Sequence, residues 1–228
     1  DLSSTLRDLP GRMEGILLTH DHQDHVGAVE FVAERFGLPV LAHPRTAERL
    51  AAKVRVDRLI EDGARLPFGH SDGRPGEIEC VFTPGHALGH LCFFEPRYQG
   101  LVCGDMVSTL SSILIDPEDG DMADYMASLE RLAQMPVRTV YPAHGPPDSR
   151  GVQVVEDQIV HRRAREEAVR AVAVAGPVSL DDLTAEVWGD VPRPMLAMAR
   201  KSAVSILTML ARQGRASFGD GTARPPHG

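Results

Sequence analysis

The segment His20-Asp21-His22-Gln23-Asp24-His25 brings four candidate metal ligands, His20, His22, Asp24 and His25, within six residues. It directly follows Gly15–Thr19, an apolar stretch typical of a short buried strand. His20 and His22 alternate, so their imidazoles point the same way from an extended chain. A strand that ends in a loop with ligands is where α/β folds carry their chemistry. A solvated histidine-rich loop is the alternative, and the apolar strand before the segment disfavours it.

Three later apolar stretches each end near one more histidine or aspartate. His86 follows Cys80–Phe82, Asp105 follows Leu101–Cys103, and His144 follows Thr139–Tyr141. Zinc takes imidazole nitrogen and carboxylate oxygen, and a catalytic site keeps one position for water. Five histidines and two aspartates are enough ligands for two neighbouring metal ions.

The motifs His-x-His-x-Asp-His, Thr83-Pro-Gly-His-x-x-Gly-His90, Gly104-Asp105 and His144-Gly145 together resemble those of the metallo-β-lactamase superfamily of zinc hydrolases. The resemblance implies one metal held by His20, His22 and His86, and a second held by Asp24, His25 and His144. It also implies that Asp105 bridges the two ions. The features after Asp105 are most similar to the β-lactamase-like protein 2 subgroup, on the residues Ile113–Pro117, Tyr141–Gly145 and His161–Glu167.

The resemblance implies an α/β fold, an αββα sandwich, whose usual N-terminal strands are missing from this chain. It divides the chain into a catalytic domain, residues 1–150, and a winged-helix-like C-terminal domain, residues 151–228. The residue pattern itself predicts helices and strands that agree with such a fold. The predicted helices are 26–36, 46–52, 123–134, 151–175, 180–188 and 195–212. The predicted strands are 16–19, 38–42, 79–83, 91–95, 100–103 and 138–141, with turns and short strands over 60–78 and a small β wing near 216–221. Gly37 should end the first helix, and Ser179 should cap the helix 180–188.

The charge balance, the length of the apolar runs and the cysteines limit the classes of function and the location that we expect. Residues 1–150 contain 14 Lys and Arg against 23 Asp and Glu, and residues 151–228 contain 10 against 9. This balance gives no basic face for duplex DNA. The apolar runs are too short to cross a bilayer. Cys80, Cys92 and Cys103 lie in apolar strands and are predicted to be buried reduced thiols, which favours a cytoplasmic location.

The ligand set predicts two Zn²⁺ ions per chain, with Mn²⁺ as the alternative. A metal-bridged hydroxide would attack an ester, thioester or lactone, and Asp24 would also steer it and pass a proton. Two alternatives stay open: a metal-dependent endoribonuclease acting on single-stranded RNA, and a non-catalytic metal-stabilised binding module. The partner expected first is a small-molecule substrate. The sequence predicts neither the substrate's identity nor the oligomeric state.

The other polar candidates have structural explanations. His43 is expected to be a loop residue with a local hydrogen bond, and His90 to orient its own loop. His70, His161 and His227 lie in polar or terminal stretches and are predicted to be surface residues. Four hydroxyls after Asp105 are expected to belong to a turn, with contact to substrate as the less favoured role: Ser108, Thr109, Ser111 and Ser112.

Overall fold

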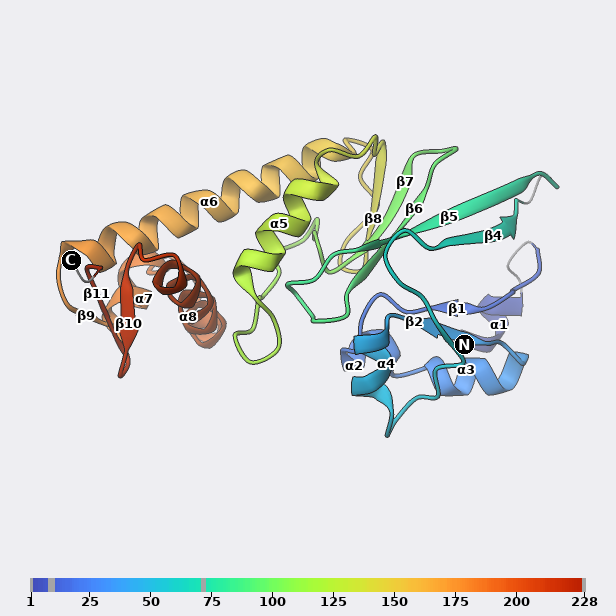
Figure 1. Cartoon of the computed structure of the whole chain (residues 1–228), viewed down its shortest axis with the longest axis horizontal. Coiled ribbons are helices and arrows are strands. Elements are labelled where there is room, and N and C mark those ends of the chain that lie inside the picture. The colour runs from blue at the N-terminus through green and yellow to red at the C-terminus, as the bar shows by residue number, and fades with distance from the viewer. Residues whose placement is uncertain (1, 8–10, 71–72, 227–228) are drawn as a thin grey trace. The chain divides into compact units, whose positions relative to one another are not determined.

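The structure, a computed structural model, describes residues 2–7, 11–70 and 73–226. The chain divides into two compact units (Figure 1). The first unit comprises residues 1–83, 88–110 and 136–151, and the second comprises 84–87, 111–135 and 152–228. The sequence instead predicts a single division, into residues 1–150 and 151–228. That division into two continuous domains remains a prediction.

The described residues of the first unit form two sheets and four helices. The helices are α1 (Leu2–Arg7), α2 (Gln23–Val26), α3 (Val29–Phe36) and α4 (Pro44–Leu50). A three-stranded parallel sheet has the order β1 (Ile16–Leu17), β2 (Val40–Ala42), β3 (Arg58–Leu59). A five-stranded sheet has the order β4 (Arg65–Gly69), β5 (Pro75–Phe82), β6 (Leu91–Glu95), β7 (Gly100–Gly104), β8 (Thr139–Pro142). Its strands pair antiparallel except β7 and β8, which are parallel.

Two apolar clusters order these elements into layers. One cluster joins the helices to the small sheet through Val29, Val40 and Leu50. The other lies between the sheets and includes Leu41 of β2 and Phe93 of β6. Burying both faces of the small sheet explains why all three residues of β2 are buried. The predicted α/β class is therefore confirmed, with a helical layer and two sheets within this unit.

The prediction of one continuous helix over residues 26–36 is wrong. The chain forms α2 and α3 instead, with Gly27 as the C-cap of α2. Glycine weakens a helix interior, so this position breaks easily. The break leaves α2 as a single short turn that carries Asp24 and His25. Gly37 ends α3 in the left-handed conformation, as predicted.

The parallel pair β7 and β8 fixes where two candidate ligands emerge. Gly104 and Pro142 are register partners at the ends of these strands. Asp105 and His144 follow them within two residues. Because parallel strands end at the same sheet edge, both side chains start from one place. Thr19, just before the ligand segment, accepts a hydrogen bond from the Leu91 N–H at 2.8 Å, which ties that segment to β6.

The second unit is mainly helical. Its helices are α5 (Met122–Leu132), α6 (Val152–Ala175), α7 (Leu180–Val187) and α8 (Leu196–Arg212), with a 3-10 turn η1 (Arg193–Met195). A small antiparallel sheet has the order β10 (Ser217–Gly219), β11 (Thr222–Arg224), β9 (Val178–Ser179). Ser179 caps α7 by accepting from the Asp182 N–H, as predicted. Leu183, Ile206 and Leu207 are fully buried and form the core of this unit. Within the described part of the chain, every helix is too short or too polar to cross a membrane.

Candidate metal centre

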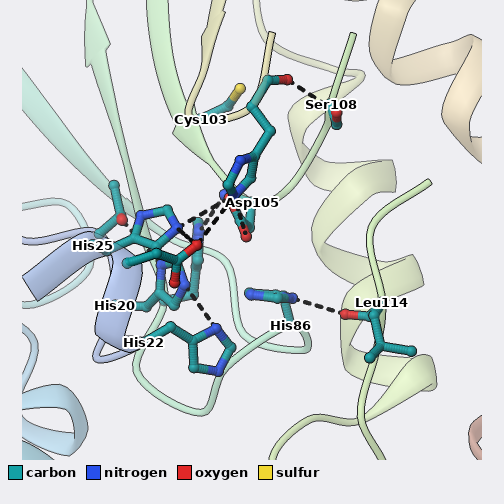
Figure 2. A network of polar contacts seen from close by, with 12 residues as sticks. His20, His22, His25, His86, Cys103, Asp105, Ser108 and Leu114 are labelled. Carbon is teal, nitrogen blue, oxygen red and sulfur yellow. Dashed lines mark hydrogen bonds and ion pairs between the residues drawn. The ribbon is translucent and has the colours of Figure 1, made fainter. Parts of the chain in front are cut away.

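His20 and His22 converge as their alternation predicts. His20 is completely buried, and the Thr19 hydroxyl lies 3.0 Å from its Nδ1 atom. This contact directs the Nε2 atom of His20 inward, where it lies 3.0 Å from Nδ1 of His22. Figure 2 shows both rings beside His25 and Asp105. Two imidazole nitrogens therefore face one point, as ligands of one metal do.

Asp24, His25 and His144 form a second group. The short helix α2 carries Asp24 and His25, and His144 follows β8. The Oδ2 atom of Asp24 lies 3.7 Å from Nε2 of His25 and 3.5 Å from Nε2 of His144. The side chain of Asp24 is 62% exposed, whereas that of His25 is 12% exposed. Asp24 is thus the member of the group that solvent and small molecules reach most easily.

Asp105 reaches toward the second group with both carboxylate oxygens. Its Oδ1 atom lies 3.5 Å from Nε2 of His25, and its Oδ2 atom lies 3.5 Å from Nε2 of His144. Asp105 is also one of four residues whose ligand atoms lie within 4.8 Å of one another, with His20, His22 and His86. The three residues of the second group, Asp24, His25 and His144, meet the same distance limit among themselves. All seven predicted ligand residues thus fall into two groups, and Asp105 adjoins both.

His86 is held by the main chain of a distant segment. Its Nδ1 atom lies 3.0 Å from the carbonyl oxygen of Leu114 (Figure 2). A carbonyl only accepts, so Nδ1 carries the proton and Nε2 keeps its lone pair. A ligand histidine is commonly oriented in this way by a hydrogen bond from its other nitrogen. The sequence pattern gives no sign of Leu114, because the partner is a main-chain atom 28 residues away.

The hydroxyls after Asp105 support the His144 loop. Ser108 Oγ donates to the carbonyl oxygen of His144 at 2.9 Å, and Thr109 Oγ1 donates to that of Pro146 at 2.9 Å. Gly145 has φ +114° and leaves no space for a Cβ, which would lie 2.0 Å from Thr109 Oγ1. These contacts confirm the predicted turn role for Ser108 and Thr109. They also explain why glycine follows the ligand.

An ion pair between α4 and Asp21 anchors the segment His20–His25 from its other side. Arg49 of α4 donates from Nε to Oδ2 of Asp21 at 2.6 Å. The side chain of Asp21 is only 7% exposed. The carboxylate between the two ligand histidines therefore fixes the loop to α4. Sequence inspection misses this role, since Asp21 looks like another acidic neighbour of the ligands.

The remaining predicted histidines have separate positions. His43 caps α4, with its Nδ1 atom accepting from the Arg45 N–H at 3.2 Å, as predicted for a loop residue. His161 is exposed, as predicted. His70 was predicted to be a surface residue, and that is wrong: its side chain is 9% exposed because it packs against Phe68 and Tyr98. His227 lies outside the described residues.

The donor set fits a metal centre. Five imidazoles and two carboxylates converge. The side chain of Asp105 is only 8% exposed. A buried carboxylate is costly unless a cation or hydrogen-bond donors compensate it. Imidazole and carboxylate together suit zinc, manganese and iron.

Comparison with known proteins identifies the same region. The chain matches the family model of the metallo-beta-lactamase superfamily over residues 5–144. It is 31% identical over 236 residues to a lactamase-like protein, vrtG, of Penicillium aethiopicum, covering 97% of this chain and 71% of the relative. It is 25% identical over 218 residues to a beta-lactamase-like protein 2 homolog of Caenorhabditis elegans, covering 93% and 70%. A hydroxyacylglutathione hydrolase of Klebsiella pneumoniae is 40% identical over 93 residues, which are 40% of this chain and 32% of the relative.

Solved structures agree on the fold. A beta-lactamase domain protein from Burkholderia ambifaria superposes with a TM-score of 0.81 at 22% identity, covering 97% of this chain and 76% of that one. A second protein, solved in a di-iron-bound form, superposes with a TM-score of 0.57 at 31% identity, covering 69% of this chain and 81% of that one. The predicted family resemblance is therefore confirmed.

Proposed function

Because the chain belongs to the metallo-beta-lactamase superfamily, we propose that it is a hydrolase with a dinuclear zinc site that acts on an ester, thioester or lactone. His20, His22 and His86 would hold the first zinc ion, Asp24, His25 and His144 would hold the second, and Asp105 would serve both. Manganese is the alternative metal, and the di-iron form of one structural neighbour adds iron to the metals to be measured.

The position of Asp105 carries this proposal. Its two carboxylate oxygens lie at equal 3.5 Å distances from His25 and His144, while it belongs to the group of His20, His22 and His86. A carboxylate that lies close to both groups of ligand atoms is suited to bridge two cations. With a single metal ion, one of the two groups of candidate ligands would bind nothing.

When bound, the metals supply an activated water and polarise the carbonyl oxygen of the substrate. The residues of the chain supply position and proton transfer. Asp24 is the most exposed carboxylate of the centre, so it is suited to hold a proton and deliver it to the leaving group. Thr19 and Leu114 orient the rings of His20 and His86 through their second nitrogens.

Charge and similarity support a small-molecule substrate. Residues 1–150 are strongly acidic, which disfavours a polyanion such as RNA. One partial relative carries the name of an acyl–glutathione hydrolase, which supports thioesters within the proposed class. We therefore rank single-stranded RNA cleavage and a non-catalytic role below hydrolysis of a small acyl compound.

The two-domain division belongs to the same proposal. Residues 1–150 form the catalytic domain, and residues 151–228 form a winged-helix-like domain in a cytoplasmic protein. The sequence of three helices α6, α7 and α8 followed by the β10–β11 hairpin supports the winged-helix description.

The test is a substrate profile of the purified protein with its metal content measured by mass spectrometry. We expect turnover of a thioester, an ester or a lactone, abolished by a chelator and restored by zinc. Asp105→Asn should abolish it, whereas Glu34→Gln, at an exposed carboxylate on α3, should not. Cleavage of single-stranded RNA alone would contradict the substrate class, and turnover that survives complete metal removal would contradict the mechanism.

A further inference from the structure

The second unit contains a cavity of about 160 Å³ beside its single tryptophan. Its walls come from the segment 112–114, from α6, from α8 and from the turn after α7. We call it the Trp188 cavity, and its main lining residues are Leu114, His161, Arg165, Trp188, Met198 and Ile206. No role in the proposed metal centre uses this space.

The walls of the Trp188 cavity are mostly apolar. Trp188 and Ile206 are buried, and Met198 is 44% exposed at the rim. An engineered apolar cavity of about 150 Å³ in another protein binds benzene. The Trp188 cavity therefore has room for one six-membered ring or a branched chain of similar size. Methionine at the rim adapts its shape to such groups.

One side of the cavity is cationic. The Arg165 guanidinium lies over the Trp188 ring, 4.8 Å from its centroid, and donates to the carbonyl oxygen of Val187. Arg162 is 6% exposed and donates to the carbonyl oxygen of Ile113. None of the described residues that line the cavity is acidic. Two guanidinium groups beside an apolar space are complementary to a ligand that joins an apolar body to a carboxylate.

The segment 112–114 connects the cavity to a candidate metal ligand. Leu114 lines the cavity, and its carbonyl oxygen is the partner of His86 Nδ1 at 3.0 Å (Figure 2). Ile113 lines it too and binds Arg162. Ser205 of α8 holds the next residue, donating from Oγ to the carbonyl oxygen of Ile115 at 2.6 Å. A group that enters the cavity therefore contacts the segment that orients His86.

We propose that the Trp188 cavity binds a small cyclic or branched aliphatic carboxylate, with the carboxylate at Arg165, and that binding alters the environment of the His86 ring through Leu114. The binding part of this inference does not depend on the proposed hydrolysis. The ligand is therefore a free acid, because an acyl group bound in an ester or thioester carries no carboxylate to pair with Arg165.

Trp188 is the only tryptophan in the sequence, so its fluorescence reports this site alone. The probes are cyclohexanecarboxylate and its neutral counterpart cyclohexylmethanol, titrated into the full chain. We expect a saturable fluorescence change with the carboxylate and at least about tenfold weaker binding of the alcohol, because a charge-assisted hydrogen bond is lost. Equal affinity for the two probes, or no response to the carboxylate, would overturn the proposal.

Two variants locate the site, and calorimetry measures their binding independently of fluorescence. Arg165→Met keeps an apolar stem and should weaken only the carboxylate, by about tenfold. The matched control is Arg163→Met on the same helix, at a side chain 63% exposed and paired with Glu130, which should bind both probes normally. Ala199→Leu fills the cavity and should abolish binding of both probes while the protein still unfolds cooperatively. Undiminished binding by Ala199→Leu would show that the ligand binds elsewhere.

The coupling to His86 has its own readout. Histidine labelled with ¹⁵N in its ring gives a resonance for Nδ1 of His86, identified by its loss in His86→Asn. Saturating cyclohexanecarboxylate should shift this resonance in the wild-type chain and not in Ala199→Leu. An unshifted resonance in the ligand-saturated wild type would refute the coupling while leaving the binding result intact.

Discussion

The Nε2 atom of His90 accepts a hydrogen bond from the backbone N–H of Asp105 at 3.2 Å. Its other nitrogen, Nδ1, lies 2.9 Å from the Thr83 hydroxyl, and the whole residue is buried. Gly104 passes so close that a Cβ there would lie 2.6 Å from His90 Nε2. His90 is therefore a positioning residue: it fixes the backbone from which the carboxylate of Asp105 extends.

Replacing His90 with alanine should lower the stability and loosen the centre without removing a ligand. The change leaves the Asp105 N–H unpaired and opens a cavity, which should cost about 2–4 kcal/mol of unfolding free energy. We expect metal content near that of the wild type and reduced turnover, with His90→Gln recovering part of both stability and turnover through its amide oxygen. Urea unfolding with metal analysis provides the measurement. Complete loss of both metals from a folded His90→Ala protein would mean that His90 is itself a ligand.

The three cysteines should be unreactive in the folded protein. Cys80, Cys92 and Cys103 lie outside any disulfide and are fully buried. Burial raises the pKa of the Cys80 thiol to about 11, so at about pH 8 only about a thousandth of it is thiolate. We expect no alkylation by iodoacetamide until a denaturant is added, and then three modified residues per chain by mass spectrometry. Rapid labelling of one cysteine in the native protein would show that its strand opens.

Much of the candidate centre follows from the sequence, because its ligands lie at strand ends. The segment His20–His25, Asp105 and His144 each directly follow an apolar strand, so local periodicity is enough to find them. Helix caps can also be predicted from the neighbouring residues alone, as Ser179 and Gly37 show. The predicted strand 91–95 has the same bounds as β6.

The partners that orient the ligands could not be predicted in this way. Leu114 acts on His86 through a carbonyl that every residue type has, and Ser108 acts on His144 across 36 residues. The burial of His70 depends on its contacts with Phe68 of β4 and with Tyr98, which follows β6, whereas residues 60–78 are predicted only as turns and short strands. The Trp188 cavity arises where α6, α8, the turn after α7 and the segment 112–114 meet, which no periodicity of one segment encodes.

Gly85→Ala should be far more destabilising than its size suggests. Gly85 has φ +131°, and a Cβ there would lie 2.2 Å from the backbone nitrogen of Tyr125. Because a backbone cannot yield as a flexible side chain does, we expect a loss of at least about 3 kcal/mol. Gly37→Ala is the matched control, since it has φ +65° with nothing within 4 Å and should cost about 1 kcal/mol from strain alone. Urea unfolding of both variants gives the comparison, and equal losses would contradict the close approach.

Asp121 is the N-cap of α5, and its ionised carboxylate should make the stability of the protein depend on pH. Partial burial alone would raise the pKa of Asp121, but hydrogen bonds from the Asp124 and Ala123 N–H groups and from Arg212 outweigh it and hold that pKa below its ordinary value. A depressed folded pKa stabilises the protein above the unfolded pKa of about 3.9, and this contribution is lost as pH falls through the folded pKa.

Asp121→Asn tests that sign, because asparagine keeps the cap and loses the charge. At neutral pH we expect the variant to be less stable by about 0.5–1 kcal/mol. The difference should shrink as the pH falls below about 4. Urea unfolding of both proteins across this range measures it. A difference that stays constant down to about pH 2 would mean that the charge of Asp121 contributes nothing.

The three carboxylates of the ligand region should differ in a fixed order, which tests their assigned roles. Asp105→Ala removes a ligand from both proposed ions and should leave at most one metal per chain with no measurable turnover. Asp24→Ala should lose the second metal and most turnover, leaving a weakly active site with one ion. Asp21→Ala should keep both metals but lower stability by about 1 kcal/mol, because Arg49 loses its carboxylate partner while its side chain, 39% exposed, stays within reach of water. Metal content by mass spectrometry, turnover and urea unfolding together separate the three outcomes. If Asp21→Ala lost metal while Asp24→Ala retained both ions, the assignment of Asp24 to the second site would be wrong.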